Sequence, residues 1–475
     1  MMAAVDYNAA AGVKGATVIV GLGKTGLSVA RYLAQRGEAF VVADSRRDPP
    51  GLKQLLSIAP NVECHLGGFE PRIFEQAQRL IVSPGVSIKE PVIASAVARG
   101  AEILGDIALF AAQAGAPIVA ITGSNGKSTV TAMAGAMAEH AGLNAKVGGN
   151  IGIPALDFLT GPAKAVAGDA PMAANVEKPA FYVLELSSFQ LETTPNLNAF
   201  AAVVLNVSAD HMDRYTTIQE YSAAKQIVYR NCHYRVFNRD DALGTQLVKQ
   251  VDGSAQDQVV SFGLGAPPTG NDFGIDNHGG APWLMKGQQA LMRADEMSLP
   301  GRHNQANALA ALALGEAMKI RIEDMLHVLR NFVGLPHRMQ LVAELKEVSW
   351  YNDSKGTNVG ATVSAIAGMP GSKLLIAGGD GKGADFEPLR AAVIANNVRL
   401  VILIGRDADR IEKVLSGVVQ IETATTMQAA VVLASKLAKA GEKVILSPAC
   451  ASFDMFNDYQ HRGDVFMQAV RSLPL

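Results

Sequence analysis

The chain has 475 residues, of which 49% are hydrophobic and 18% are charged, and its formal net charge is −2. This length exceeds what one hydrophobic core supports and predicts about two to four domains, while the composition excludes an intrinsically disordered chain. The near-neutral charge excludes a general attraction to nucleic acid.

At the N-terminus, residues 1–15 lack the basic stretch and apolar core that mark a secreted protein. No apolar run in the chain approaches the roughly 18 uninterrupted residues of a membrane-spanning helix. The cysteines Cys64, Cys232 and Cys450 lie far apart, match no metal-binding spacing and are expected to be reduced thiols. We therefore expect a cytoplasmic protein that does not insert into membranes.

Residues 17–105 alternate short apolar runs with helical patterns. The runs Thr17–Val20, Phe40–Ala43 and Leu80–Val82 predict strands, and the segments between them predict helices. This rhythm is typical of a parallel sheet with helices on both faces. We expect a Rossmann-like first domain over residues 1–105.

A glycine-rich loop, Gly21 to Gly26, follows the first predicted strand and opens a helix, and Asp44 follows the second strand. This pattern matches the G-x-G-x-x-G fingerprint with its downstream acid, which would suggest NAD with Asp44 on the ribose. The chemistry is less specific than the fingerprint, because the loop binds a diphosphate and the acid or its neighbours bind the adjacent nucleoside. A UDP group would satisfy both, and a purely structural glycine turn is the alternative. Ser83-Pro84-Gly85, after the third predicted strand, could line the same crevice.

The residues expected to hold a nucleotide diphosphate at this crevice are Gly21, Leu22, Gly23, Lys24, Thr25, Asp44, Ser45, Arg46, Ser83 and Gly85.

A second domain is expected over residues 106–334, and its strongest feature is the loop Gly123-Ser124-Asn125-Gly126-Lys127-Ser128-Thr129. The loop follows the apolar run Pro117–Ile121, which predicts a buried strand, and precedes Val130–His140, which predicts a helix. Loop glycines let backbone N–H groups turn toward phosphate oxygens, and the helix N-terminus adds partial positive charge. Lys127 can reach the β and γ phosphates of ATP, and the hydroxyl of Ser128 can bind Mg²⁺.

This loop is a shortened variant of the standard phosphate-binding loop. The standard loop has four residues between its first Gly and its Gly-Lys pair, which would require Gly where this chain has Ile121. The alternative interpretation is a glycine-rich turn with a solvated lysine, but the strand–loop–helix context favours a phosphate site.

The rest of the second domain continues the strand pattern. Phe181–Leu186 and Ala201–Val207 predict strands, and Gly161–Pro179, rich in Ala, Gly and Pro, predicts an exposed excursion before them. Residues 255–300 predict short strands and turns at the edge of the domain, and His303–Met318 predicts a helix.

Polar residues follow two of these strands. Glu185 lies at the carboxyl end of the first, and His211 follows the second. Ligands of open α/β sheets gather at the carboxyl ends of strands, so Glu185 and His211 are expected to converge on Lys127 and Ser128. A carboxylate and an imidazole beside polyphosphate suggest Mg²⁺, although a lone histidine more often only caps or packs. Lys225, on the next predicted helix, would by itself indicate a solvated lysine.

A third domain, residues 335–475, begins after Gly334-Leu335-Pro336 and repeats the doubly wound pattern. The apolar runs Leu374–Ala377, Leu400–Ile404 and Val444–Leu446 predict its strands, with helices between them.

Three polar loops of this third domain are each expected at the carboxyl end of a strand: Asn352–Asn358, Gly378–Lys382 and Ser447–Ser452. The first two carry lysines and are expected to open helices. Convergent cations suit an anionic small molecule, although one such loop alone could be a solvated turn. Arg338, at the start of this domain, could reach across to the phosphates of ATP.

Together these residues resemble the bacterial Mur ligases, which build the stem peptide of peptidoglycan, from about residue 17 to the end of the chain. The residues typical of the whole family are Gly123 to Thr129, Glu185, His211, Lys225, Asn304 to Asn307 and His337-Arg338. The residues typical of the branch that adds D-glutamate are Asp210 to Tyr215, Asn352 to Asn358, Gly379 to Lys382 and Ser447 to Ser452. The Asn-Pro-Arg loop of the relative that adds meso-diaminopimelate is absent from the sequence.

The resemblance implies an α/β protein of three domains: a Rossmann-like domain for a UDP-linked substrate, a central P-loop-type ATPase domain with a parallel sheet, and a Rossmann-like domain for an amino acid. The implied reaction is ATP-dependent formation of an amide from UDP-N-acetylmuramoyl-L-alanine and D-glutamate, through an acyl phosphate. The implied cofactor is Mg²⁺ at two sites. We expect a monomer.

The resemblance also implies residue roles. The catalytic set is Lys127, Glu185, His211 and Lys225, and Mg²⁺ would be held by Ser128, Glu185, His211 and a carbamylated Lys225. ATP would be bound by Gly123, Ser124, Asn125, Gly126, Lys127, Ser128, Thr129, Asn307, Arg338 and Asp353. Asn150 and Ser187 would join the first-domain loops in binding the UDP substrate. D-glutamate would be bound by Lys355, Thr357, Lys382, Ser452, Phe453 and Tyr459.

Two other functional classes remain open on the sequence. A nicotinamide-dependent oxidoreductase would account for Gly21 to Gly26 but leaves Lys127 unexplained. A non-catalytic nucleotide-binding switch would account for Lys127 but not for the lysine loops of the third domain. Competition between NAD and the UDP substrate tests the first class, and release of ADP that requires both an acceptor and an amino acid tests the second.

Overall fold

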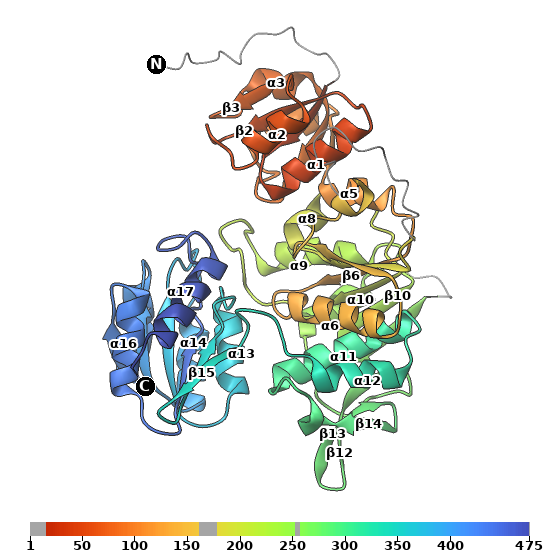
Figure 1. Cartoon of the computed structure of the whole chain (residues 1–475). Helices are drawn as coiled ribbons and strands as arrows, with labels where there is room; N and C mark the ends of the chain where they lie inside the picture. The colour runs from red at the N-terminus through yellow and green to blue at the C-terminus, as the bar shows by residue number, and fades with distance from the viewer. Residues whose placement is uncertain (1–15, 161–177, 252–256, 475) are drawn as a thin grey trace, which may run out of the picture.

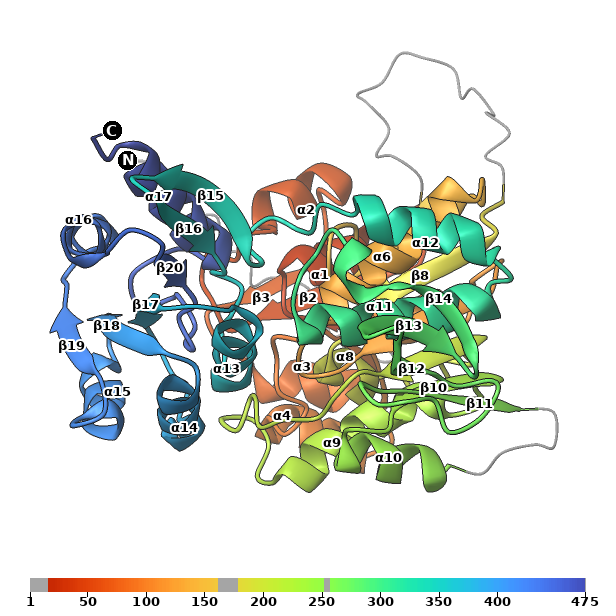
Figure 2. The same cartoon turned by 90° about the horizontal axis from the view of Figure 1, so that it is seen from below.

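The computed structural model describes residues 16–160, 178–251 and 257–474. The predictions for residues 1–15 and for most of Gly161–Pro179 therefore lie outside the described residues. The described residues form three sheets, each built from one continuous stretch of the chain. In Figure 1 the first block lies above the second, and the third lies beside the second; Figure 2 also places the second and third blocks side by side.

The first block contains a five-stranded parallel sheet in the order β3-β2-β1-β4-β5. Its strands are β1 (Ala16–Val20), β2 (Phe40–Asp44), β3 (Cys64–Leu66), β4 (Ala77–Val82) and β5 (Glu102–Leu104). Its helices are α1 (Lys24–Gln35), α2 (Leu52–Ile58), α3 (Pro71–Gln76) and α4 (Pro91–Ala98). The Rossmann-like arrangement agrees with the prediction. Because β1 lies between β2 and β4, the loop after β1 is at the point where the winding reverses and ligands bind.

The second block contains a nine-stranded sheet in the order β14-β13-β12-β11-β10-β9-β6-β8-β7. Its strands are β6 (Ile118–Thr122), β7 (Ala145–Gly149), β8 (Phe181–Glu185), β9 (Ala201–Val204), β10 (Tyr234–Asn238), β11 (Gln258–Phe262), β12 (Phe273–His278), β13 (Ala281–Lys286) and β14 (Gln289–Arg293). The sheet is parallel from β7 to β12, and β13 and β14 add an antiparallel edge. The carboxyl end of β6, between β8 and β9, is the second point where the winding reverses.

The helices of this block are α5 (Asp106–Ala111), α6 (Lys127–His140), α7 (Asp157–Thr160), α8 (Ser188–Glu192), α9 (Ile218–Gln226), α10 (Ala242–Lys249), α11 (Arg302–Ala317) and α12 (Ile322–Asn331). Helix α6 begins at Lys127, earlier than the predicted Val130, because the left-handed backbone of Gly126 ends the loop directly before it. Strand β9 ends at Val204, earlier than the predicted Val207, and the chain then turns so that the side chain of Asn206 bonds to the backbone of the phosphate-binding loop.

The third block contains a six-stranded sheet in the order β15-β16-β20-β17-β18-β19, parallel except for β15. Its strands are β15 (Gln340–Leu345), β16 (Val348–Asn352), β17 (Lys373–Gly378), β18 (Val398–Ile404), β19 (Gln420–Thr423) and β20 (Lys443–Leu446). Its helices are α13 (Val359–Gly368), α14 (Glu387–Ala395), α15 (Ala408–Leu415), α16 (Met427–Leu437) and α17 (Tyr459–Arg471).

The order of this third sheet places the carboxyl ends of β16, β20 and β17 side by side, so the three predicted polar loops share one edge. The prediction that the loop Gly378–Lys382 opens a helix is wrong in detail. The chain first turns at Gly383, and α14 begins only at Glu387.

The hydrophobic clusters show which blocks pack against one another. The first two blocks share one cluster that runs from Ile19 and Leu22 through Ile107 to Ala120 and Leu184. Among the described residues, the two clusters of the third block contain only residues of that block. The first two blocks therefore pack as one body, and the third has a core of its own. No helix within the described ranges is long and apolar enough to cross a membrane.

Candidate functional site

A cavity of about 490 Å³ opens between the first two blocks, at the loop that follows β1. The predicted residues that line it are Gly21, Gly23, Lys24, Thr25, Asp44, Ser45, Arg46, Ser83, Gly85 and Asn150. Leu22 is fully buried, and the Oγ of Ser187 accepts a hydrogen bond at 3.2 Å from the N–H of Gln190, which caps α8. Gln190, which was not predicted, lines the cavity.

Asp44 organises the loop beside this cavity. Its buried carboxylate accepts hydrogen bonds from the N–H of Leu22 at 2.7 Å and from the guanidinium of Arg46 at 2.7 Å. Burial alone would raise the pKa of Asp44, but the hydrogen bonds from Arg46 and Leu22 outweigh burial and lower it. Asp44 is therefore an ionised group already paired, and the half-exposed Arg46 is the cation that lines the cavity.

Two asparagines lie against the phosphate-binding loop, and one of them bonds to its backbone. Gly126 has a φ of +85°, and a Cβ at that position would lie 2.5 Å from Oδ1 of Asn307, so only glycine fits there. The amide of Asn206 accepts from the N–H of Asn125 at 2.8 Å and donates to its carbonyl at 3.0 Å. Asn206 was not predicted to act, although its place just beyond the carboxyl end of β9 is the signal that could have identified it.

The side chain of Lys127 folds back onto the carbonyl groups of this loop. Its Nζ donates to the carbonyl oxygens of Gly123 at 2.8 Å and Ser124 at 2.9 Å. Burial lowers the pKa of Lys127, and the nearby carboxylate of Glu185 opposes that shift. A half-buried ammonium held at the loop by two backbone carbonyl oxygens is suited to bind a phosphate anion.

Glu185, Ser128 and Arg338 form the adjoining part of the site. Burial would raise the pKa of Glu185, but Lys127, Ser128 and Asn150 together lower it. Oε1 of Glu185 accepts from Asn150 at 2.8 Å, and Oε2 is buried with no hydrogen-bond partner among the described residues. Nη2 of Arg338 donates to Oγ of Ser128 at 2.7 Å, so this arginine of the third block reaches the loop at which the sequence places the ATP phosphates.

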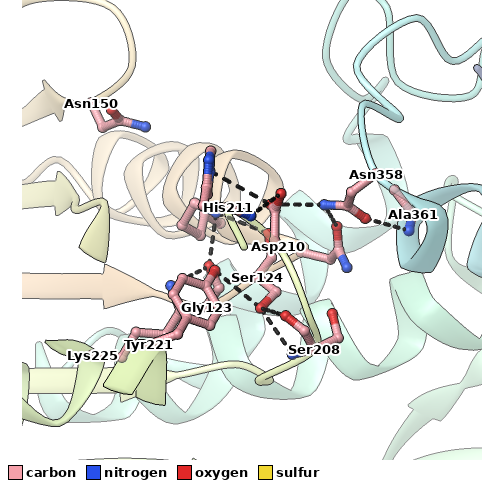
Figure 3. Close-up of polar contacts among 12 residues, drawn as sticks. Gly123, Ser124, Asn150, Ser208, Asp210, His211, Tyr221, Lys225, Asn358 and Ala361 are labelled. Atoms are coloured by element: carbon pink, nitrogen blue, oxygen red, sulfur yellow. Dashed lines mark hydrogen bonds and ion pairs between the residues drawn. The ribbon is translucent and has the colours of Figure 1, made fainter. Parts of the chain in front are cut away.

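Lys225 is not a solvated lysine. It is buried on α9, where its Nζ donates to the carbonyl oxygen of Gly123 at 3.0 Å and lies 4.4 Å from the centre of the Tyr221 ring. Burial, followed by repulsion from Lys127, lowers the pKa of Lys225 well below its usual value. Figure 3 shows Lys225 and Tyr221 beside Gly123.

His211 lies at the same edge, in a left-handed backbone conformation with a φ of 58°. Its N–H donates to Oδ1 of Asp210 at 3.0 Å, and its Nε2 lies 3.6 Å from Oδ2 of Asp210. Burial lowers the pKa of His211, against the opposing charge of Asp210. A neutral imidazole is the form that binds metals.

A second cavity, of about 580 Å³, lies between the second and third blocks. The residues predicted to bind ATP that line it are Asn125, Gly126, Thr129, Asn307, Arg338 and Asp353. Lys355, predicted to bind the amino acid, also lines this cavity, and its Nζ lies 3.9 Å from the centre of the Tyr459 ring. Burial, and then Arg338, lower the pKa of Lys355 to about 8.

The other residues predicted to bind the amino acid lie on the three loops of the third sheet. Lys382 has a φ of 47° and lies close enough to His211 to influence its pKa. The N–H of Thr357 donates to the carbonyl of Lys355 at 2.8 Å, and the buried Ser452 accepts through its carbonyl from Phe456 at 2.8 Å. Phe453 is 72% exposed.

Arg214 is a further residue of the site whose role the sequence did not indicate. Its guanidinium donates to the carbonyl of Pro84 at 2.8 Å and to the carbonyl of Val86 at 2.7 Å, and it stacks 4.1 Å above the ring of Phe189. It joins the segment that carries His211 to a wall of the first cavity. Arg214 belongs to the motif Asp210 to Tyr215, but the spacing of a motif does not predict that one of its side chains contacts the first block.

Comparisons with known proteins agree with this arrangement. The family model described as "Mur ligase MurD-like, N-terminal domain" matches residues 15–105. The model "Mur ligase middle domain" matches residues 121–315, and the model "Mur ligase, glutamate ligase domain" matches residues 337–450. Proteins named UDP-N-acetylmuramoylalanine–D-glutamate ligase from Nitrosococcus oceani and Marinobacter nauticus are 49% and 50% identical to this chain, over 96% of it and 96% and 98% of their own lengths.

Solved structures share the fold. The UDP-N-acetylmuramate-alanine ligase of Thermotoga maritima superposes with a TM-score of 0.58 at 16% identity, over 96% of this chain and 99% of its own. A pseudomurein peptide ligase type C from Methanothermus fervidus gives a TM-score of 0.57 at 17% identity, over 92% of this chain and 97% of its own.

Three α/β blocks, a strand–loop–helix turn that carries Lys127 and Ser128, and an arginine of the third block that reaches Ser128 define an ATP-dependent ligase. With relatives about half identical over nearly its whole length, the chain belongs to the Mur ligase family.

Proposed function

We propose that this protein adds D-glutamate to UDP-N-acetylmuramoyl-L-alanine, with conversion of ATP to ADP and phosphate, in the cytoplasmic synthesis of peptidoglycan precursors. The relatives that match nearly all of the chain carry the name of this reaction. The structural observation that supports it most directly is the place of Asn150. This residue lines the first cavity and donates to Glu185 at 2.8 Å, so it joins the cavity proposed for the UDP substrate to the phosphate edge.

The reaction proceeds in two displacements. The carboxylate of the UDP substrate attacks the γ-phosphorus of ATP, the bond to ADP breaks, and an acyl phosphate forms. The amine of D-glutamate then attacks the acyl carbon, phosphate leaves, and the amine gives up a proton. Lys127 and Arg338, both half-buried and at the phosphate edge, stabilise negative charge on the transferring phosphoryl group.

Mg²⁺ is the cofactor of this reaction, and the residues at the phosphate edge fit it. Oε2 of Glu185 is buried without a hydrogen-bond partner among the described residues, and the Ser128 hydroxyl is close enough to the Glu185 carboxylate to help lower its pKa. Oxygen donors of this kind suit a hard divalent cation. Glu185 and Ser128 would hold one Mg²⁺, which supplies charge neutralisation for the phosphates, and His211 would help to hold a second.

We also propose that Lys225 is carbamylated in the active enzyme. A buried amine with a lowered pKa can be neutral, and a neutral amine can add to CO₂, forming an N–C bond and releasing a proton. The product is an anionic oxygen ligand for Mg²⁺. Within the described part of the chain, no three His, Cys, Asp or Glu side chains are grouped as a metal site, so an added carboxylate would supply a ligand that the site needs.

Removal of CO₂ and bicarbonate tests the carbamate. We expect activity to fall on removal and to return when bicarbonate is added, and a crystal structure to show electron density beyond Nζ of Lys225. A bare lysine in a well-resolved, metal-bound structure would contradict it.

The proposed division of labour follows the three blocks. Residues 1–105 bind the UDP moiety, residues 106–334 bind ATP, and residues 335–475 bind the amino acid. The active form that we propose is a monomer.

A coupled assay of ADP release tests the function. We expect release only when UDP-N-acetylmuramoyl-L-alanine and D-glutamate are both present, and poor release with L-glutamate, L-alanine or meso-diaminopimelate. If one of these three acceptors worked as well as D-glutamate, the acceptor would be wrong but the ligase class would stand. Tight binding of NAD that competes with the UDP substrate would contradict the role proposed for the first block.

A further inference from the structure

Asn358 connects three loops of the site, each at the carboxyl end of a strand. It is the N-cap of α13, and its Oδ1 accepts from the N–H of Ala361 at 2.8 Å. Its Nδ2 donates to Oδ2 of Asp210 at 3.0 Å and to Oδ1 of Asn125 at 3.3 Å (Figure 3). One side chain of the third block thus caps its own helix and holds two loops of the second block.

The contact with Asp210 leads to His211. Oδ2 of Asp210 accepts from Asn358, while Oδ1 accepts from the N–H of His211 at 3.0 Å. That N–H belongs to a residue in the left-handed region, which a non-glycine residue adopts only when its surroundings hold it there. The two oxygens of one carboxylate therefore transmit the position of Asn358 to the backbone of His211.

The first turn of α13 also approaches the second block closely. A Cβ on Gly360 would lie 3.3 Å from Nδ2 of Asn125 and 3.3 Å from Oγ of Ser208. Figures 1 and 2 place α13 on the side of the third block that faces the second, and the helix also lies beside α11. The N-terminus of this helix meets the carboxylate of Asp210, which its partial positive charge favours.

We infer that Asn358 is a positioning residue for the ligase reaction, which fixes His211 through Asp210 when the third block lies against the phosphate-binding loop. This inference rests on the proposed function, because it concerns the metal edge of that reaction. It adds to that function a contact that brings the third block, which is proposed to bind the amino acid, against the proposed metal ligands of the second block.

The substitution Asn358→Ser tests the inference. Serine caps a helix about as well as asparagine, so α13 keeps its cap, but the amide that donates to Asp210 and Asn125 is lost. We expect kcat to fall about 10- to 100-fold, as found for residues that orient metal ligands. The KM for the UDP substrate, whose cavity is elsewhere, should change by less than about twofold.

Two further variants distinguish a role of Asn358 in positioning His211 from a general structural defect. Asn358→Asp keeps the cap but places a carboxylate against Asp210, and we expect a larger loss than in Asn358→Ser. In the double variant Asn358→Asp with Asp210→Asn, the new amide can donate to residue 358 and still accept from the N–H of His211. We expect the double variant to regain at least about tenfold in kcat over Asn358→Asp, a recovery that a purely structural role would not produce.

Calorimetric binding of a non-hydrolysable ATP analogue in the presence of Mg²⁺ gives a readout without turnover. We expect Asn358→Ser to need more Mg²⁺ for the same analogue affinity, and the double variant to recover. Thr426→Ala, which removes the N-cap of α16 in the same block, is the matched control and should change neither kcat nor Mg²⁺ dependence.

Unchanged kcat and Mg²⁺ dependence in Asn358→Ser, or no recovery in the double variant, would overturn the inference. Wild-type protein that released no ADP would instead contradict the proposed function, and the binding measurement would still decide the role of Asn358.

Discussion

Two lysines share one acceptor in this site. Lys127 and Lys225 both donate to the carbonyl oxygen of Gly123, from the phosphate-binding loop and from α9. Like charges so close in a buried place repel each other, and burial and repulsion lower the pKa of Lys225 well below its usual value. The role that we propose for Lys127, at the start of α6, is to hold phosphate, and the role that we propose for Lys225, on α9, requires that it lose its charge.

Lys127→Ala should abolish ADP release while leaving binding of the UDP substrate nearly unchanged. Loss of one preorganised charged donor typically costs about 10²- to 10³-fold in kcat. Lys127 lies on the loop whose Asn125, Gly126 and Thr129 line the second cavity, and the first cavity is lined by other residues. Calorimetry with the UDP substrate checks the second half of the prediction, with the exposed Lys249→Ala as control. Equal loss of UDP-substrate affinity would show that the two cavities are not separate sites.

Lys382→Ala should raise the KM for D-glutamate far more than the KM for the UDP substrate. The acceptor carries two carboxylates, and loss of a cationic partner weakens the binding of an anion. Lys382 lies on a loop of the third sheet and near enough to His211 to lower its pKa. Initial rates with each substrate varied in turn provide the measurement. A larger rise in the KM for the UDP substrate than in the KM for D-glutamate would show that Lys382 does not bind the amino acid.

At the residue scale, the sequence predicted side chains that lie in recognisable loops, such as Lys127 and Asp44. It did not predict that Lys225 is buried, since a lysine on a predicted helix has no spacing signal for burial. It also missed Asn206 and Gln190, because their roles depend on which backbone groups the fold brings opposite them.

Among the secondary-structure elements, the segment after β9 and the loop after β4 are tied together by Arg214. Arg214→Ala should raise the KM for the UDP substrate and lower kcat, because both a cavity wall and the segment of His211 lose support. Arg214→Lys should restore little, since an ammonium cannot place two donors in the planar geometry of a guanidinium. Steady-state kinetics measure both variants, with the exposed Arg72→Ala as control. Full recovery with lysine would mean that only the charge matters.

The pairing of Glu442 with Arg399 should make the stability of the third block depend on pH. Both oxygens of Glu442 accept from Arg399, at 2.7 Å each, and this pairing lowers the pKa of Glu442 to about 2 although burial opposes it. The unfolded value is about 4.3, so the stabilisation is present above that pH and is lost as the pH falls toward the folded value.

We expect Glu442→Gln to lower the unfolding temperature at pH 7 and the difference from wild type to narrow between about pH 5 and pH 3. Thermal unfolding followed by circular dichroism measures this, with the exposed Glu412→Gln as control. A difference that stayed constant over this range would show that the carboxylate charge does not stabilise the fold.

Most of the longer strands and the helix after the phosphate loop could be predicted from apolar periodicity. Strands β3 and β5 could not, because three residues are too few to show alternation. Strands β7 and β10 were also missed. Strand β7 ends in Gly148-Gly149, which weakens any strand signal, and β10 contains the charged Arg235, which is buried in the fold.

In the whole molecule, the first two blocks share a hydrophobic core, whereas the third has a core of its own. We expect calorimetry of the ligand-free protein to show two thermal transitions, one of them for the third block. A non-hydrolysable ATP analogue with Mg²⁺ should bring the transitions closer, because the second cavity is lined by both blocks and binding stabilises them together. A single two-state transition without ligand would contradict the separation of the blocks.

The sequence predicted three α/β units and their order, since each unit carries its own strand–helix rhythm. It could not predict that the first two share a core or that the third also meets the second through Asn358. Those contacts depend on how the units dock, and periodicity within a unit carries no information about docking.

Each of the three sheets is built from one continuous stretch of the chain, and this has a consequence for synthesis on the ribosome. Domains fold as units, the N-terminal ones first, so the phosphate-binding loop can form while the third block is still being translated. At that point the loop lacks Arg338 and Asn358. The cavity proposed for ATP is therefore complete only after the third block has been translated, because residues of that block such as Asp353 and Lys355 form one of its walls.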